Sequence, residues 1–132
     1  MERAAELMML VQQSPHDAYR RVDFDARVAS ARPDQLVALC FEQFDLALGS
    51  AIAADRRGDN ARRSASLTRA LAALAALQLG VDRTAAGGDA LLQFYDGLRR
   101  SVLSSVPTFD PATLARARRD ALDVAEALGL RG

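Results

Sequence analysis

Apolar residues recur every three or four positions through four segments of the sequence, and this spacing is what most constrains the fold. It places apolar side chains along one face of an α-helix, so each segment is expected to form an amphipathic helix that packs against the others. The four apolar stripes are Val37, Phe41, Phe44, Leu48 and Ile52; Leu67, Leu71, Leu74 and Leu77; Leu91, Tyr95, Leu98 and Val102; and Leu114, Ala117, Ala121, Val124, Ala125 and Leu128.

Proline, glycine and aspartate residues mark the expected ends of these helices. Proline suits the first turn of a helix, an aspartate just before that turn can cap its free N–H groups, and glycine favours a helix end. The expected boundaries are Pro33 and Gly58 for the first helix, Asp59 and Gly80 for the second, Asp89 and Pro107 for the third, and Asp110-Pro111 for the start of the fourth. Short connections make neighbouring helices antiparallel. We therefore predict an all-α fold, an antiparallel up-down four-helix bundle over residues 33–129.

Residues 1–29 precede this bundle and are expected to form an N-terminal arm. A short helix could span residues 2–13, because Ser14-Pro15 is a helix breaker. In the segment 18–29, Val22, Phe24, Ala26 and Val28 alternate with charged residues, which is the period of an extended chain. No other strand signal offers a pairing partner. We therefore expect an extended segment over 18–29, with a short helical arm as the alternative.

Length and charge exclude several classes of protein. A chain of 132 residues is the size of one domain, and its formal net charge of zero gives no general attraction to nucleic acid or to anionic membranes. The apolar run Leu7 to Val11 is too short to span a bilayer and lacks the features of a signal peptide. The one cysteine, Cys40, cannot form an intramolecular disulfide and is expected to be a small buried apolar residue. We expect a cytoplasmic protein.

Residues for catalysis are scarce. His16 is the only histidine and precedes the predicted bundle, so neither a Glu-x-x-His metal centre nor a Cys-His pair can be built inside it. A phosphotransfer bundle would need an exposed histidine in the middle of a helix, which makes this reading a remote alternative. The paired arginines are interspersed with acidic residues and are expected to be solvated. We predict no enzyme activity, no metal and no cofactor.

Apolar residues also lie away from the core stripes. Leu39 and Leu46 are on the side of the first helix opposite Phe41 and Phe44, and the run Ala70 to Leu77 is apolar all round. A helix that is apolar all round is either buried or covered by a partner. The N-terminal arm could cover these residues, or they could be scattered exposed side chains. Alternatively, they form a docking surface for an amphipathic segment of another protein.

Several short motifs occur in the order and spacing of a known family. They are AYRRV (Ala18 to Val22), SARPDQLV (Ser30 to Val37), GDN (Gly58 to Asn60), GGD (Gly87 to Asp89) and the tyrosine Tyr95. Over about residues 17 to 128 the chain resembles the flagellar secretion chaperone family FliS. It departs from the family pattern in having no tryptophan after Leu128 and in having Gly97 where the family tends to have methionine.

The resemblance implies a helical bundle that binds the C-terminal segment of flagellin 1:1, prevents premature polymerisation and presents the complex to the flagellar export gate. It also implies that an N-terminal tyrosine, here Tyr19, occupies part of the groove when flagellin is absent. The runner-up is a regulatory helical bundle that binds another flagellar protein, and free protein could form a homodimer. The expected partner-binding residues are Tyr19, Val22, Leu39, Leu46, Ala72, Ala76, Leu79, Leu92 and Leu103.

Overall fold

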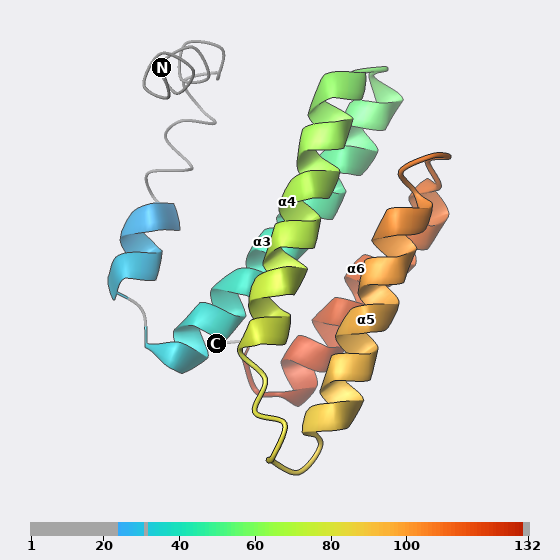
Figure 1. The fold of residues 1–132 in the computed structure, drawn as a ribbon. Helices are drawn as coiled ribbons and strands as arrows, with labels where there is room; N and C mark the ends of the chain where they lie inside the picture. The colour runs from blue at the N-terminus through green and yellow to red at the C-terminus, as the bar shows by residue number, and fades with distance from the viewer. Residues whose placement is uncertain (1–23, 31, 131–132) are drawn as a thin grey trace, which may run out of the picture. The chain divides into compact units, whose positions relative to one another are not determined.

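The structure, a computed structural model, describes residues 24–30 and 32–130, and its elements are α-helices (Figure 1). Those ranges contain no strand, so the predicted all-α class is confirmed. The chain divides at Pro33 into two compact units, and the second unit carries most of the fold. Its helices are α3 (Pro33–Arg56), α4 (Asn60–Leu79), α5 (Gly88–Ser104) and α6 (Pro111–Ala127).

In the first unit, residues 24–30 are helical, which corrects the expectation of an extended chain for that part of 18–29. An extended segment needs a neighbouring strand to accept its backbone hydrogen bonds, whereas a helix satisfies them internally. The Ser30 hydroxyl also donates to the carbonyl oxygen of Ala26, at 3.1 Å. Residues 1–23, including the possible helix 2–13 and the rest of the extended segment, lie outside the described residues.

Asp59, Gly80 and Asp110 cap helices as predicted, whereas α5 begins at Gly88 and ends at Ser104, before the expected Pro107. The Asp59 side chain accepts a hydrogen bond from the backbone N–H of Arg62 at 3.0 Å, and Gly58 turns the chain with a φ of +70°. Asp110 accepts from the backbone N–H groups of Ala112 and Thr113 at the start of α6. The Thr113 hydroxyl donates to Asp110 at 2.6 Å, and these bonds hold the pKa of that carboxyl below its usual value.

Consecutive helices of the second unit run in opposite directions. Figure 1 shows the α3–α4 and α5–α6 connections at one end and the α4–α5 loop at the other. Contacts also join the first helix to the last. Arg118 of α6 donates to both carboxylate oxygens of Asp45 on α3, at 2.9 and 3.3 Å. The guanidinium lies over Gly49, where a Cβ would meet it at 3.0 Å. Glycine at this position therefore leaves room for the α3–α6 contact.

One hydrophobic core is shared by all four helices, and most of the predicted stripe residues lie in it or against it. Its largest fully buried side chains include Phe44, Leu74 and Tyr95. The rings of Phe41 and Tyr95 join α3 to α5 with centroids 6.0 Å apart, a distance typical of favourable aromatic pairs. The prediction that Leu128 belongs to the core stripe of the fourth helix was wrong, because α6 ends at Ala127 and Leu128 is exposed. Leu130 packs against the core beyond it.

Small polar residues and one arginine link α3 to α4. Ser66 is fully buried, and its hydroxyl donates to that of Ser50 on α3 at 3.0 Å. Arg63 pairs with Asp55 on α3 at 2.8 Å, and its guanidinium lies 5.3 Å from the centre of the Phe109 ring. Arg63 thereby holds the α5–α6 connection against the α3–α4 pair. Cation–π contacts of this kind contribute about 0.5–1 kcal/mol at exposed sites.

Two leucines of α4 provide a direct test of this core. Replacing the buried Leu74 by alanine is expected to lower the free energy of unfolding by about 2–5 kcal/mol, because it leaves a cavity. Leu79→Ala, at a side chain that is 89% exposed, is expected to change it by less than about 0.5 kcal/mol. Urea unfolding followed by circular dichroism measures both values. Equal losses would contradict the core assignment.

Candidate functional site

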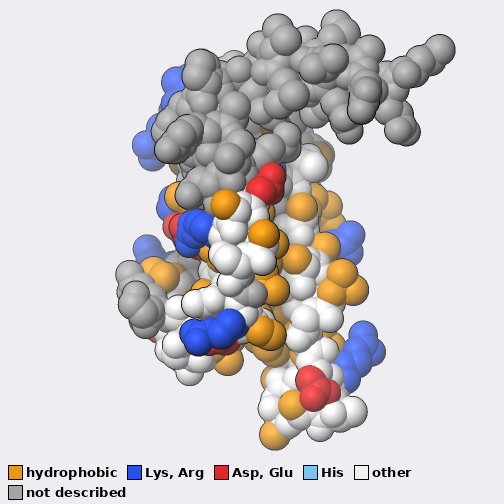
Figure 2. Space-filling view, turned by 90° about the vertical axis from the view of Figure 1, so that its left-hand side faces the viewer, with side chains coloured by type: hydrophobic (Ala, Val, Ile, Leu, Met, Phe, Trp, Pro, Cys, Tyr) orange, Lys and Arg blue, Asp and Glu red, His pale blue; other side chains and the backbone are white. Residues whose placement is uncertain are grey.

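Five of the predicted partner-binding residues are exposed in the structure. Leu46 and Leu103 are each 40% exposed, Leu79 is 89% exposed, and Ala72 and Ala76 also face solvent. Figure 2 shows one face of the molecule, where hydrophobic side chains are interspersed with arginine and acidic side chains. Single exposed leucines are ordinary on protein surfaces, and these five residues are spread over three successive helices. This surface can receive apolar side chains.

Leu39 differs from Leu46, the other leucine on the outer side of α3 that the sequence analysis singled out. It is only 6% exposed, although it lies outside the contiguous core cluster. A helical wheel describes one helix by itself, so it could not predict this burial. Leu92 is half-buried. Tyr19 and Val22 lie outside the described residues.

The open residues occupy several helix faces. Leu46 lies on the side of α3 away from Phe44; Ala72, Ala76 and Leu79 lie on the outer side of α4; and Leu92 and Leu103 share one side of α5. We define the exposed members on α3, α4 and α5 (Leu46, Ala72, Ala76, Leu79 and Leu103) as the apolar surface.

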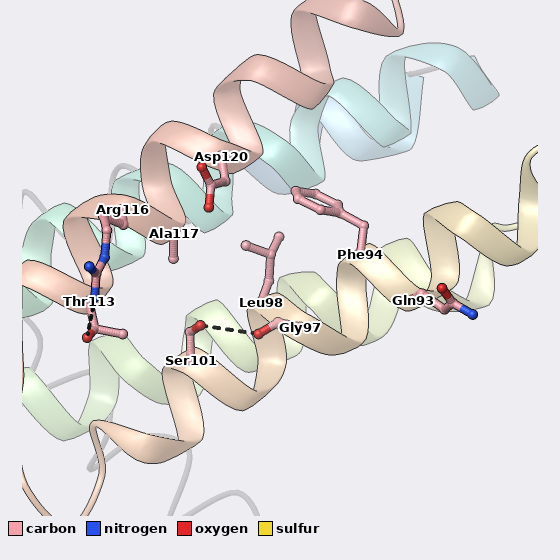
Figure 3. A pocket seen from close by; sticks show the side chains of 9 residues that line it. All are labelled: Gln93, Phe94, Gly97, Leu98, Ser101, Thr113, Arg116, Ala117 and Asp120. Atoms are coloured by element: carbon pink, nitrogen blue, oxygen red, sulfur yellow. Dashed lines mark hydrogen bonds between the residues drawn. The ribbon is translucent and has the colours of Figure 1, made fainter.

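A groove between α5 and α6 was not predicted from the sequence. Its volume is about 350 Å³, and its walls come from both helices (Figure 3). Leu98 and Ala117 point toward each other from opposite sides in Figure 3. The lining residues are Gln93, Phe94, Gly97, Leu98 and Ser101 of α5 with Thr113, Arg116, Ala117 and Asp120 of α6. We call this cavity the α5–α6 groove.

Gly97 explains why the α5 wall is hollow. A Cβ built at this position would find no heavy atom closer than 3.9 Å, the distance to a guanidinium nitrogen of Arg100. Ser101, one turn further along, is also small, and its hydroxyl donates to the Gly97 carbonyl oxygen at 3.2 Å. Glycine inside a helix lowers stability by about 1 kcal/mol relative to alanine. The signal in the sequence was therefore a costly glycine one turn before a serine.

The described residues contain no group of three or more histidine, cysteine, aspartate or glutamate side chains that could hold a metal ion. Two side chains that are buried or half-buried have a shifted pKa, and both lie in the core or against it. Burial raises the pKa of the Tyr95 phenol to about 12, and the nearby Cys40 adds to the effect. Burial also raises the pKa of the Cys40 thiol, which disfavours the reactive thiolate.

By length and composition alone, α3 could cross a membrane. The core helix of a soluble protein passes the same test, and α3 directs Phe41, Phe44 and Leu48 into the shared core. The finding is therefore weak evidence of a membrane span.

Comparison with protein families matches residues 15–127 to the family described as flagellar protein FliS. The chain belongs to the FliS family. The match covers most of the sequence, including the helices that form the apolar surface and the groove. A search of curated proteins found no match. FliS is a family of flagellar chaperones and is not known for catalysis, which places this chain among proteins that assist the flagellum.

The buried phenol of Tyr95 predicts a pH dependence of stability. In the unfolded chain it ionises near pH 10, whereas the folded state keeps its proton up to about pH 12. The unfolded state therefore loses this proton first, and the free energy of unfolding is expected to fall as the pH rises from about 10 to 12. Below that window Tyr95 adds no pH dependence.

A Tyr19→Phe variant leaves Tyr95 as the single remaining tyrosine, so the absorbance of its phenolate can be followed alone. We expect a titration midpoint close to 12 in buffer, falling to about 10 in concentrated urea. Identical midpoints in the two solvents would show that the phenol is not buried in solution.

Proposed function

We propose that this chain is a cytoplasmic export chaperone that binds the amphipathic C-terminal segment of flagellin in a 1:1 complex. Binding covers the apolar face of that segment, prevents premature polymerisation and allows the complex to be presented to the flagellar export gate. The observation that carries the proposal is the apolar surface on α3, α4 and α5 of a FliS family member.

We infer that α3–α6 form an antiparallel up-down four-helix bundle, which serves as a preformed scaffold for this contact. The alternating connections and the Asp45–Arg118 contact between the first and last helices support this arrangement. A scaffold held by its own core loses little conformational entropy on binding, so more of the contact energy appears as affinity. Each square ångström of apolar surface that flagellin covers contributes about 25 cal/mol before those costs.

Within this proposal, Tyr19 and Val22 remain binding residues of the N-terminal arm. A segment of the chain that competes for the apolar surface lowers the apparent affinity for flagellin by the fraction of molecules in which the surface is open. In the absence of flagellin, the same exposed leucines could pair two copies of the chain, which would be a second way of covering them.

Leu46→Asp tests the apolar surface. We expect the dissociation constant for the C-terminal segment of flagellin to rise at least about tenfold, equivalent to about 1.4 kcal/mol, because a carboxylate would lose water without gaining a partner. Leu122→Asp on α6 is the matched control, since Leu122 is 41% exposed, Leu46 is 40% exposed, and Leu122 lies outside the proposed surface. Calorimetry measures both affinities, and thermal unfolding checks that each variant folds.

If Leu46→Asp and Leu122→Asp weakened flagellin binding equally, the apolar surface would have no special role in binding. Unfolding of the Leu46→Asp variant would show that Leu46 belongs to the core. Failure of the unmodified protein to bind the flagellin segment would overturn the proposed function.

A further inference from the structure

We propose that one end of the second unit, where α3 connects to α4 and α5 connects to α6, docks on the surface of an anionic lipid bilayer. We call it the basic end and define it by Arg56 and Arg57 at the turn from α3 to α4, Arg99 of α5 and Val106 of the α5–α6 connection. The inference does not depend on flagellin, because it concerns different residues and a different partner.

The two helix connections of the basic end lie together. Figure 1 shows the α3–α4 and α5–α6 connections at the same end of the helices and the α4–α5 loop at the other end. The guanidinium of Arg63, in the first turn of α4, lies 5.3 Å from the ring centre of Phe109, which belongs to the α5–α6 connection. This contact holds the start of α4 against the α5–α6 connection.

The acidic side chains near these connections are already paired with other arginines. The pairs are Asp55 with Arg63 at 2.8 Å, Asp59 with Arg62 at 3.7 Å, and Asp96 with Arg100 at 2.9 Å. Arg56, Arg57 and Arg99 are exposed, and within residues 24–30 and 32–130 no hydrogen bond or ion pair engages their side chains. These three arginines therefore present uncompensated positive charge to the solvent.

Charge is distributed unevenly along the helices, although the formal net charge of the chain is zero. The opposite end holds the α4–α5 loop, the start of α3 and the end of α6. Its acidic residues are Asp34, Asp82, Asp89, Asp123 and Glu126, and Arg83 lies among them. A negatively charged bilayer attracts the basic end and repels the acidic end, so it orients the molecule without any net charge.

An exposed apolar side chain at the basic end favours a bilayer over other anions. Val106 is 57% exposed, and Pro107 beside it is also exposed. Basic residues next to an apolar tip combine the electrostatic and apolar contributions by which proteins bind anionic membrane surfaces. Single-stranded nucleic acids instead bind by stacking on aromatic side chains. None of the aromatic residues in the described part of the chain is exposed.

The small number of unpaired arginines predicts weak and reversible attachment. A basic residue close to an anionic membrane surface raises the binding constant about fivefold. Guanidinium groups also donate paired hydrogen bonds to phosphate oxygens, which lipid headgroups present. The protein would therefore exchange between solution and the membrane surface without inserting a helix.

Sedimentation of the full chain with vesicles tests the basic end. We expect binding to vesicles that contain phosphatidylglycerol but not to vesicles of phosphatidylcholine, and loss of this binding in about 1 M salt, where charges are screened within about 3 Å. Arg57→Glu is expected to weaken binding to the anionic vesicles at least fivefold, as is Arg99→Glu. Arg83→Glu, the same change in the exposed α4–α5 loop, is the matched control and should bind like the unmodified protein.

A tryptophan probe reports which end contacts the lipid. The chain contains no tryptophan, so Val106→Trp places a single fluorescent indole at the basic end, and Ala85→Trp places one in the α4–α5 loop. On addition of phosphatidylglycerol vesicles, the emission of the Val106→Trp variant is expected to shift to shorter wavelength, because the indole enters a less polar environment. The emission of the Ala85→Trp variant is expected to stay unchanged.

Three results would overturn the proposal: equal binding to the two kinds of vesicle, equal weakening by Arg57→Glu and Arg83→Glu, or equal emission shifts in the two tryptophan variants. Tighter binding to RNA or to polyglutamate than to the anionic vesicles would also overturn it, since the basic end would then recognise nucleic acid or an acidic protein surface. Arg57→Glu is expected to retain its affinity for the flagellin segment, so the two proposals stand or fall separately.

Discussion

Burial of one apolar seam among α3–α6 is the constraint on which the rest of the structure depends. The chain is rich in alanine and leucine, which favour helices, but most of the stability of helices in proteins comes from packing of their apolar faces. The four helices adopt a defined arrangement because the space between them is filled by side chains that include Phe44, Leu74 and Tyr95. The serine contact between α3 and α4 and the arginine contact between α3 and α6 then fix which helices are neighbours. Every surface described above is presented by this core.

Local features of the fold could be predicted from the sequence because each depends on a few neighbouring residues. The caps at Asp59 and Asp110 need only an aspartate before a helix, and the core stripes need only their spacing. The helix at 24–30 was only the alternative prediction, because the alternation of apolar and charged residues suggests an extended chain but supplies no strand to pair with it. The burial of Leu39 and the α5–α6 groove were not predicted, because neither follows from the spacing of apolar residues within one helix. The one signal that could have pointed to the groove is Gly97, a residue that is costly within a helix.

The molecule combines exposed leucines with a balanced set of charges. The chain has 17 basic and 17 acidic residues, and Figure 2 shows charged side chains among the hydrophobic ones. Large unbroken apolar patches promote association, whereas patches divided by charge leave a protein soluble and still able to bind. Partner specificity can then come from the charges, since their positions decide which apolar segment fits and in which direction.

The Asp45–Arg118 contact has a consequence for how the chain is made. Its two residues are 73 positions apart, so it cannot form until almost the whole sequence has left the ribosome. Until then, α3 lacks the neighbour that α6 provides, and part of its apolar face is open to the surrounding nascent chains. During synthesis there is therefore an interval in which α3 has been made but its α6 neighbour has not. A protein proposed to cover the apolar segment of another polypeptide would therefore itself expose apolar surface during its own synthesis.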